Sequence, residues 1–156
     1  MNKDIQFKKN HSVINCRVSG ILIKENKVLL HKKKVDDFWN LVGGKIKIGE
    51  SSDKALIREF NEELKIGIYP QRLVCIAENF FSFKKFFHEF NFIYLIECSN
   101  IENITDDFFE KDTYYKWFLL DDIENINIKP SFIKKFLLKI PSETTHLIHK
   151  DNYEEY

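Results

Sequence analysis

Residues 44–66 read GKIKIGESSDKALIREFNEELKI, and this stretch decides the fold. Its first part is rich in glycine and predicts a loop. Ser51 or Ser52 would then be the N-cap of a helix, because either hydroxyl can accept a hydrogen bond from a free amide of the first turn. The helix carries an apolar stripe at helical spacing, made of Leu56, Ile57, Phe60 and Leu64. The stretch therefore predicts a loop followed by a helix that packs one face on a core.

Three glutamates, Glu59, Glu62 and Glu63, lie together on another face of the predicted helix. Positions three and four apart are neighbours on a helical surface, so the three carboxylates fall within an arc of roughly 100°. Carboxylates at this spacing repel one another unless a cation neutralises them, and oxygen ligands suit a hard divalent cation. The alternative is a solvated acidic face, which is the usual fate of a charge run on a helix.

The stretch closely resembles the Nudix box. The box has Gly, five residues, Glu, seven residues, Arg-Glu, an apolar residue, any residue, Glu-Glu, any residue, Gly and an aliphatic residue. The residues in register are Gly44, Glu50, Arg58, Glu59, Phe60, Glu62, Glu63 and Ile66. Two fixed gaps and six identical residues make this a specific signal, which favours the metal site over the solvated acidic face.

One position departs from the box, because Lys65 stands where the family has its second glycine. A residue just past a helix end often adopts the left-handed conformation, which costs a lysine on the order of 1 kcal/mol. Gly67 offers another exit. We therefore expect the helix to run one or two residues longer and to turn at Gly67, with the three glutamates unmoved.

The resemblance implies an α/β fold, the Nudix-type α/β/α sandwich with a mixed β-sheet between helices, and it extends loosely over residues 13–140. It also implies that Mg²⁺ or Mn²⁺ bridges the carboxylates and a pyrophosphate. The metal ligands would be Glu59, Glu62 and Glu63, with the backbone carbonyl of Gly44 as a fourth donor. By the same resemblance, Glu62 or Glu63 would take the proton from the attacking water.

Further residues would support this centre. Arg58 precedes two of the glutamates at contact spacing and would orient a carboxylate by a charge-assisted hydrogen bond. The resemblance makes Glu50 a supporting or outer-sphere member of the site. In some family members a further glutamate comes from a late loop. Glu110 is the candidate here, and the residues that compete with it are Asp106, Asp107 and Asp112. An ordinary solvated loop is an equally good interpretation.

The implied activity is metal-dependent hydrolysis of a small nucleoside diphosphate linked to another group, by attack of water on the pyrophosphate. Nucleotide sugars, ADP-ribose and normal or oxidised dNTPs are the substrate hypotheses, and the sequence does not rank them. The alternative is a catalytically silent Nudix-like domain that senses or binds nucleotides. Only Lys65 favours that alternative, since all three box glutamates are intact.

Length and composition predict one enzyme-sized domain over residues 1–156. The extent of the resemblance implies a core at about 13–140, followed by a C-terminal tail at 141–156. Of the 156 residues, 44% are hydrophobic and 15% aromatic, which is enough for a sizeable core. The 24 basic and 24 acidic residues cancel, which argues against a polynucleotide or an anionic membrane as partner. Fifteen phenylalanines favour a homodimer if some stay exposed.

The cysteines and the first residues of the sequence predict the cellular compartment of the protein. Cys16, Cys75 and Cys98 are odd in number and lie in apolar stretches, which predicts buried thiols in a reducing compartment. The first residues lack the apolar run of a secretion signal, and about 18 consecutive apolar residues occur nowhere. We therefore expect a cytoplasmic protein.

Patterning beyond the box predicts further elements. Strands are expected at Val13–Ile23, Lys27–His31, Arg72–Ser82, Phe86–Cys98 and Tyr114–Leu120, with a hairpin at residues 25–26. Pro130 would open a final amphipathic helix that Pro141 closes. The residues 99–113 read as a polar, acidic connector.

Several single residues have two interpretations. Trp39 could stack on a nucleobase, although a buried tryptophan in a strand is more common. His88 and Glu89 could reach a substrate or form the polar face of a strand. His146 and His149 lack a third ligand in the sequence, so a metal role for them is disfavoured.

Overall fold

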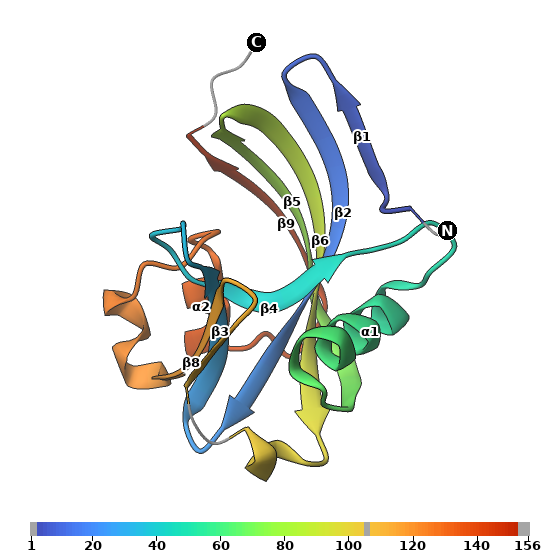
Figure 1. Cartoon of the computed structure of the whole chain (residues 1–156). Coiled ribbons are helices and arrows are strands. Elements are labelled where there is room, and N and C mark those ends of the chain that lie inside the picture. The colour runs from blue at the N-terminus through green and yellow to red at the C-terminus, as the bar shows by residue number, and fades with distance from the viewer. Residues whose placement is uncertain (1–2, 105–106, 153–156) are drawn as a thin grey trace.

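The structure is a computed structural model that describes residues 3–104 and 107–152 (Figure 1). The strands are β1 Gln6–Lys9, β2 Ser12–Lys24, β3 Lys27–Lys33, β4 Asn40–Lys45, β5 Ile68–Phe83, β6 Lys85–Cys98, β7 Phe108–Glu110, β8 Thr113–Leu119 and β9 Thr145–Asp151. The helices are α1 Ser52–Leu64 and α2 Ile133–Leu138, with 3-10 turns η1 Ile101–Asn103 and η2 Leu120–Asn125. Within the described ranges no helix is long and apolar enough to cross a membrane.

The long strand β2 organises the sheet. Along one edge it pairs in parallel with β6, from Ser12 opposite Phe86 to Leu22 opposite Ile96. Along its other edge it pairs antiparallel with β1, then β4, then β3. The sheet order is β7-β8-β3-β4-β2-β6-β5-β9, with β1 beside β2. Parallel and antiparallel pairs therefore meet on β2. In Figure 1 the strands spread apart above and below the middle of β2.

Two hydrophobic clusters cover the two faces of the sheet. On one face α1 buries Ala55, Leu56 and Phe60 among residues of β2, β4 and β6. On the other face α2 and η2 bury a second set, which consists of Ile123, Phe132, Ile133, Phe136 and Leu137. Successive residues of a strand point to opposite faces, so β2 serves both clusters. This arrangement confirms the predicted α/β/α sandwich with a mixed sheet.

The predicted hairpin between β2 and β3 is confirmed. Glu25 and Asn26 both take positive φ angles, 47° and 60°, as a two-residue turn between right-twisted strands requires. The predicted strands 72–82, 86–98 and 114–120 are also present, as β5, β6 and β8. Ser51 is the N-cap of α1, although its hydroxyl makes no capping hydrogen bond. The Ser52 hydroxyl instead lies 2.7 Å from the Tyr94 hydroxyl.

Other expectations about the elements were wrong. The C-terminal tail expected at 141–156 is in part a strand, because Thr145–Asp151 forms β9 and pairs in parallel with β5. β9 has seven residues and lies at the edge of the sheet, and exposed and partly buried residues alternate along it. A pattern this short and this weakly apolar does not predict a strand from sequence alone. The final helix is short and begins at Ile133, three residues after Pro130. β5 starts earlier than predicted and contains two irregularities in its pairing with β6.

The end of α1 also differs from expectation. The helix stops at Leu64, and Lys65 itself takes the left-handed conformation, with φ 58° and ψ 31°. Gly67 lies outside the left-handed region, so the expected extension to Gly67 is wrong. The Lys65 amide donates to the Asn61 carbonyl at 3.2 Å, and its ammonium donates to the Glu62 carbonyl at 3.0 Å. These bonds offset part of the backbone cost, and the helix ends where a glycine would end it.

A close approach of two backbones fixes β4 against β2. Gly43 lies opposite Ser19 in the antiparallel register. A Cβ atom on residue 43 would overlap the Val18 carbonyl oxygen and lie 2.8 Å from the Ser19 Cα atom. Only glycine therefore allows this strand pairing, which sets the position of the residues that follow β4.

We expect Gly43→Ala to lower the free energy of unfolding by about 1–3 kcal/mol, because backbone atoms must move to admit the methyl group. Gly67→Ala is the matched control, since a Cβ atom there meets nothing within 4 Å. The control should be neutral or stabilising by up to about 1 kcal/mol. Guanidinium unfolding midpoints measure both changes, and equal midpoints would contradict the assignment.

We expect Lys65→Gly to raise the free energy of unfolding by about 1 kcal/mol, because glycine adopts the left-handed conformation without a Cβ clash. Lys54→Gly, in the exposed first part of α1, should instead lower it by roughly 0.5–1 kcal/mol. Thermal unfolding of both variants measures the contrast. A destabilised Lys65→Gly protein would show that the side-chain hydrogen bond outweighs the backbone strain.

Candidate active site

Arg58 is the centre of a cluster of carboxylates at the start of α1 and along one of its faces. Its Nε and Nη2 atoms donate to the two carboxylate oxygens of Glu50 at 2.7 and 2.9 Å. Its Nη1 atom donates to Glu59 Oε1 at 2.6 Å and to Glu62 Oε2 at 3.3 Å. The Nη2 atom also donates to the Lys45 carbonyl at 3.0 Å. One guanidinium thus ties the loop before α1 to two of the three glutamates.

Glu50 is held by the loop as well as by the arginine. The Lys47 amide donates to Glu50 Oε2 at 3.1 Å. Hydrogen bonding from Arg58 lowers the pKa of Glu50, and Glu50 in turn raises the pKa of Arg58. Bidentate pairs of this kind fix both planes, so the pair acts as a brace between the loop and the helix. The two residues expected to support and to orient the site are thus in direct contact with each other.

Gly44 lies directly against Glu59. A Cβ atom on residue 44 would overlap the Glu59 carboxylate group. The Glu59 side chain is only 15% exposed, whereas that of Glu62 is 54% exposed. Glycine at this position therefore leaves space for a carboxylate beside the backbone of β4. A divalent cation fits the all-oxygen donor set that these residues offer.

Glu63 points away from the arginine and toward β3 and β8. The Tyr115 hydroxyl donates to Glu63 Oε2 at 3.1 Å, and His31 Nδ1 lies 3.8 Å from the same oxygen. Burial raises the pKa of the Glu63 carboxyl. Burial, with positive charges nearby, lowers the pKa of His31 to about 3, so this imidazole is neutral near pH 7. Glu63 is the member of the trio with the most unusual environment.

The three glutamates are thus neighbours with different partners. Among the described residues, no three His, Cys, Asp or Glu side chains converge as a metal cluster would require. The reason is visible in the contacts: the Arg58 guanidinium holds Glu59 and Glu62, while Glu63 binds Tyr115. Bringing the carboxylates onto one cation would need rotations of these side chains, with Arg58 retaining Glu50.

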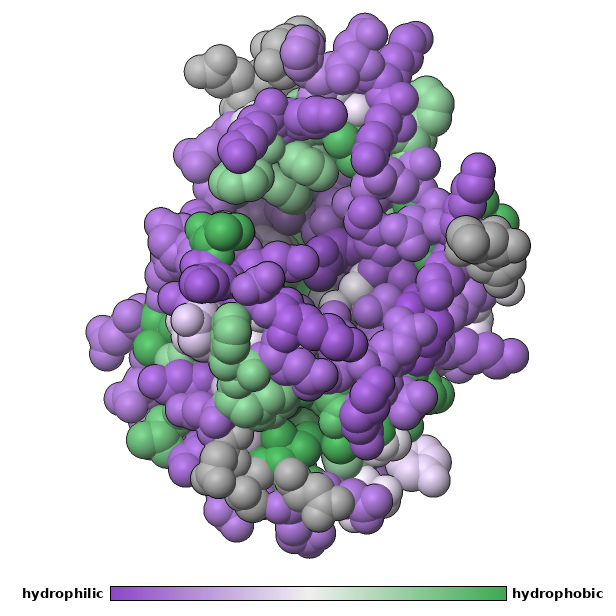
Figure 2. Space-filling model, viewed as in Figure 1, coloured by the Kyte–Doolittle hydropathy of each residue, from purple (hydrophilic) through white to green (hydrophobic). Residues whose placement is uncertain are grey.

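A pocket of about 460 Å³ opens beside this cluster. Figure 2 shows the hollow on a mostly hydrophilic face of the molecule. Strands β2, β3, β4, β5 and β6 form most of its walls. The loop before β4, the end of α1, the start of β8, the segment before α2 and the end of β9 contribute the remaining residues. The charged residues around it are Arg17, Lys33, Asp36, Lys45, Glu63, Glu89, Lys129 and Asp151. The pocket therefore has Glu63 in one wall and a mixture of charges around it.

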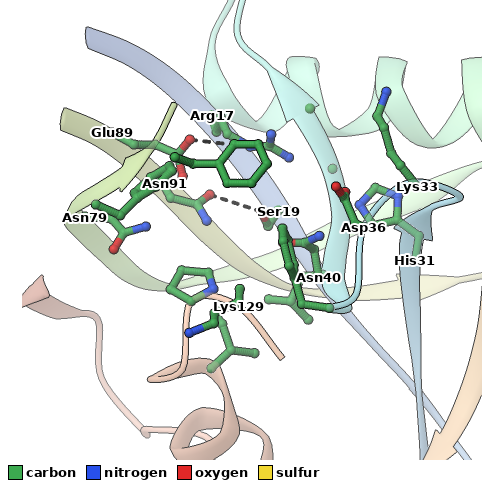
Figure 3. Close-up of a pocket in the computed structure, with 18 of the residues that line it drawn as sticks. Arg17, Ser19, His31, Lys33, Asp36, Asn40, Asn79, Glu89, Asn91 and Lys129 are labelled. Atoms are coloured by element: carbon green, nitrogen blue, oxygen red, sulfur yellow. Dashed lines mark hydrogen bonds and ion pairs between the residues drawn. The ribbon is translucent and has the colours of Figure 1, made fainter. Parts of the chain in front are cut away.

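The close-up in Figure 3 shows two opposed groups of side chains. Arg17, Asn79, Glu89 and Asn91 lie on one side, and His31, Lys33, Asp36 and Asn40 on the other. Lys129 comes from below and pairs with Asp151 of β9 at 3.0 Å. A ligand that enters this pocket would touch both groups.

The late-loop acids do not join the cluster in the described structure. Glu110 ends β7 as an exposed residue. Its charge adds to the effects of burial and of Glu63, which raise the pKa of Tyr115. Asp107 accepts a hydrogen bond from the Trp117 amide, and Asp112 occupies a turn with φ 62°. Asp106 lies outside the described residues.

The other single residues are also accounted for. Trp39 packs edge-on against Phe118, with centroids 4.8 Å apart, and is absent from the pocket lining. His146 pairs with Glu78 at 2.8 Å, and His149 packs against Phe132. Glu89 lines the pocket, whereas its neighbour His88 stacks on Phe80 on the opposite face.

Sequence reasoning did not find Tyr115, His31 and Arg17. Each lies in a strand whose pattern indicates only burial, and each reaches the site through pairing between distant strands. β3 and β8 pair so that His31 is opposite Tyr115. Only knowledge of that register would have linked these two residues to Glu63.

Comparison with known proteins agrees with this geometry. The family model described as NUDIX domain matches residues 15–139. The chain is 31% identical over 137 residues to an 8-oxo-dGTP diphosphatase of Buchnera aphidicola subsp. Schizaphis graminum, which covers 85% of this chain and 88% of that protein. It is 40% identical over 57 residues to an ADP-ribose pyrophosphatase of Methanocaldococcus jannaschii, which covers only 35% of this chain and 32% of that protein.

Solved structures support the same fold. The MutT protein of Bacillus halodurans matches with a TM-score of 0.65 at 21% identity, over 86% of this chain and 89% of that chain. Nudix hydrolases generally use divalent metal ions. The extent of the family match and the box cluster around Arg58 lead to one conclusion. The chain belongs to the Nudix hydrolase family and is a hydrolase that acts on phosphorus-containing anhydrides.

Proposed function

We propose that this protein is a metal-dependent pyrophosphohydrolase of a small nucleotide, a nucleoside diphosphate linked to another group. The observation that carries the proposal is that Glu63, from the box helix, lines the pocket and has a raised pKa. A carboxylate that is partly desolvated, next to an open pocket, is typical of a general base. Nucleotide sugars, ADP-ribose and normal or oxidised dNTPs all belong to the proposed class.

Glu59, Glu62 and Glu63, with the Gly44 carbonyl, are the proposed ligands of Mg²⁺ or Mn²⁺. A divalent ion bound there would neutralise phosphate charge and activate water. Arg58 would keep its bidentate pair with Glu50 and so hold the first turns of α1 in place while Glu59 and Glu62 turn to the ion. Glu110 stays a candidate for a further ligand.

The residues around Glu63 suggest how a proton is moved. Tyr115 donates to Glu63 Oε2 and leaves Oε1 available. The neutral His31 next to it adds no charge that would hold Glu63 ionised and inert. We infer that Glu63 accepts the proton of the attacking water and that Tyr115 orients it. Glu62, which is half exposed, is the other candidate base.

Positive side chains on the pocket suit the phosphates of the substrate. Arg17, Lys33 and Lys45 all line it, and Lys45 follows the Gly43–Gly44 pair directly. Cationic groups stabilise charge on a transferring phosphoryl group.

Three free cysteines support our further proposal of a cytoplasmic location.

The first experiment measures product release from ADP-ribose, nucleotide sugars, dinucleotides, and normal and oxidised dNTPs, with Mg²⁺, with Mn²⁺ and with EDTA. We expect metal-dependent turnover of at least one compound and none in EDTA. Glu63→Gln should lower kcat by at least about 100-fold, because a general base contributes that much or more. Glu62→Gln should also be strongly impaired as a proposed metal ligand, while Glu97→Gln, on the exposed end of β6, is the control.

Silence across this panel, with nucleotide binding still measurable, would instead support the alternative of a catalytically silent sensor. Full activity of Glu63→Gln would remove that residue from the mechanism and leave Glu62 as the candidate base.

A stability measurement tests the environment of Glu63 independently of catalysis. Because its pKa is raised in the folded state, ionisation of Glu63 costs stability as pH rises above the ordinary range of a glutamate. Without metal at pH 7.5, Glu63→Gln should therefore raise Tm, because glutamine carries no charge for burial to disfavour. At pH 4 the difference should shrink. A lower Tm for Glu63→Gln at pH 7.5 would contradict the assignment, and Glu97→Gln should change little at either pH.

A further inference from the structure

The pocket wall that β2, β5 and β6 form is unusually rich in buried polar side chains for the face of a β-sheet. In the described part of the chain, five polar or charged residues are buried, and they are Asn15, Ser19, Asn79, Glu89 and Asn91. All except Asn15 line the pocket. Strand pairing explains the grouping, because Glu89 of β6 lies opposite Asn15 of β2 on one side and Asn79 of β5 on the other. The wall is therefore a row of amides centred on one carboxylate.

Glu89 is buried and forms one long ion pair, with Arg17 (Figure 3). Its residue is 7% exposed, and the nearest cation atom, Arg17 Nε, is 3.9 Å from Oε2, which is beyond hydrogen-bonding distance. Asn15 supplies a hydrogen bond, yet burial still raises the pKa of Glu89. A buried carboxylate normally collects several donors, because desolvation without them is costly. This one keeps acceptor capacity directed at the pocket.

Asn79 adds a second unused acceptor. Its residue is 4% exposed, and its Oδ1 atom has no hydrogen-bond partner in the structure. Asn91, by contrast, is engaged, since its Oδ1 atom accepts from the Ser19 hydroxyl at 3.1 Å (Figure 3). The wall therefore offers acceptors to a ligand that brings N–H or O–H donors.

Aromatic rings around the pocket indicate that the ligand group is flat. Phe38, Phe81 and Phe83 all line it. Phe83 is 56% exposed, with the Lys84 ammonium 5.8 Å from the centre of its ring. Phe81 already stacks on Phe87, with centroids 4.8 Å apart and planes 4° from parallel, which presents a firm ring surface. Aromatic faces that surround polar edge-reading groups are typical of nucleobase binding.

We propose that Glu89 selects the base of the nucleotide, and that it prefers a base with two adjacent N–H donors on one edge, as guanine has at N1 and N2. The proposal rests on the proposed function, since it takes the ligand to be a nucleotide. An ionised carboxylate has only acceptors and can receive both donors at once. Adenine would place its N1 acceptor against the carboxylate and be disfavoured. Oxidation of guanine at C8 leaves this edge intact, so Glu89 favours both forms over adenine.

The test is equilibrium binding of dGMP, dIMP and dAMP by calorimetry, with the wild-type chain and Glu89→Gln. The wild type should bind dGMP about tenfold or more tighter than dAMP, with dIMP between them because it lacks the 2-amino group. In Glu89→Gln the preference should be lost or reversed, since an amide can donate to adenine N1 and accept from its 6-amino group. Glu97→Gln, the same substitution at an exposed position of the same strand, should keep the wild-type order.

A second measurement needs no variant. A dGMP methylated at N1 lacks the central donor and should bind the wild type about tenfold more weakly than dGMP. Equal binding of dGMP, dAMP and the methylated nucleotide would overturn the assignment of Glu89. Turnover of dGTP and dATP separates the two proposals. Metal-dependent hydrolysis of both at equal rates would refute only the proposal that Glu89 selects the base. Preferential dGMP binding, with no hydrolysis of any compound in the nucleotide panel, refutes the proposed function alone.

Discussion

Three carboxylates on one face of a short helix are the constraint on which the rest of this molecule depends. Without a metal ion they would repel one another. Arg58 compensates part of this charge, because it binds two of the three carboxylates and is itself held by Glu50. The brace also reaches the Lys45 carbonyl, so the loop between β4 and α1 is tied to the helix. Gly43 and Gly44 let this assembly press against β2 and Glu59 without clashes. The segment from Gly43 to the end of α1 therefore both compensates the charge of the carboxylates and allows the close backbone packing.

Much of this could be predicted from sequence because the relevant signals are local. The stripe of Leu56 and Phe60, the N-cap at Ser51 or Ser52 and the spacing of the glutamates all belong to one helix and its start, where periodicity determines geometry. The turn at Glu25 and Asn26 was recognisable for a similar reason. The end of the helix could not be predicted in this way, because the hydrogen bonds that help Lys65 to adopt the left-handed conformation appear only in the folded structure.

The pocket could not be predicted in the same way, because its walls depend on register between distant strands. The relation of Glu89 to Asn79 and Asn15 exists only once β2, β5 and β6 are aligned, and alternation within one strand reveals neither partner. Tyr115 reached Glu63 by the same route. From the sequence, Glu89 could equally reach a substrate or form the polar face of a strand. Its position in the pocket wall became visible only with the fold.

The parallel pairing of β2 with β6 has a consequence for how the chain folds. It joins Ser12 to Phe86 and Leu22 to Ile96, residues separated by the whole box and by all of β5. Contacts this far apart along the chain form slowly, because a long loop must close before they bring any gain. The hairpin of β5 and β6, whose strands are adjacent in sequence, can form earlier. The polar wall that β2 completes is therefore a late product of folding, and until it closes the chain exposes unpaired strand edges of the kind that lead to aggregation.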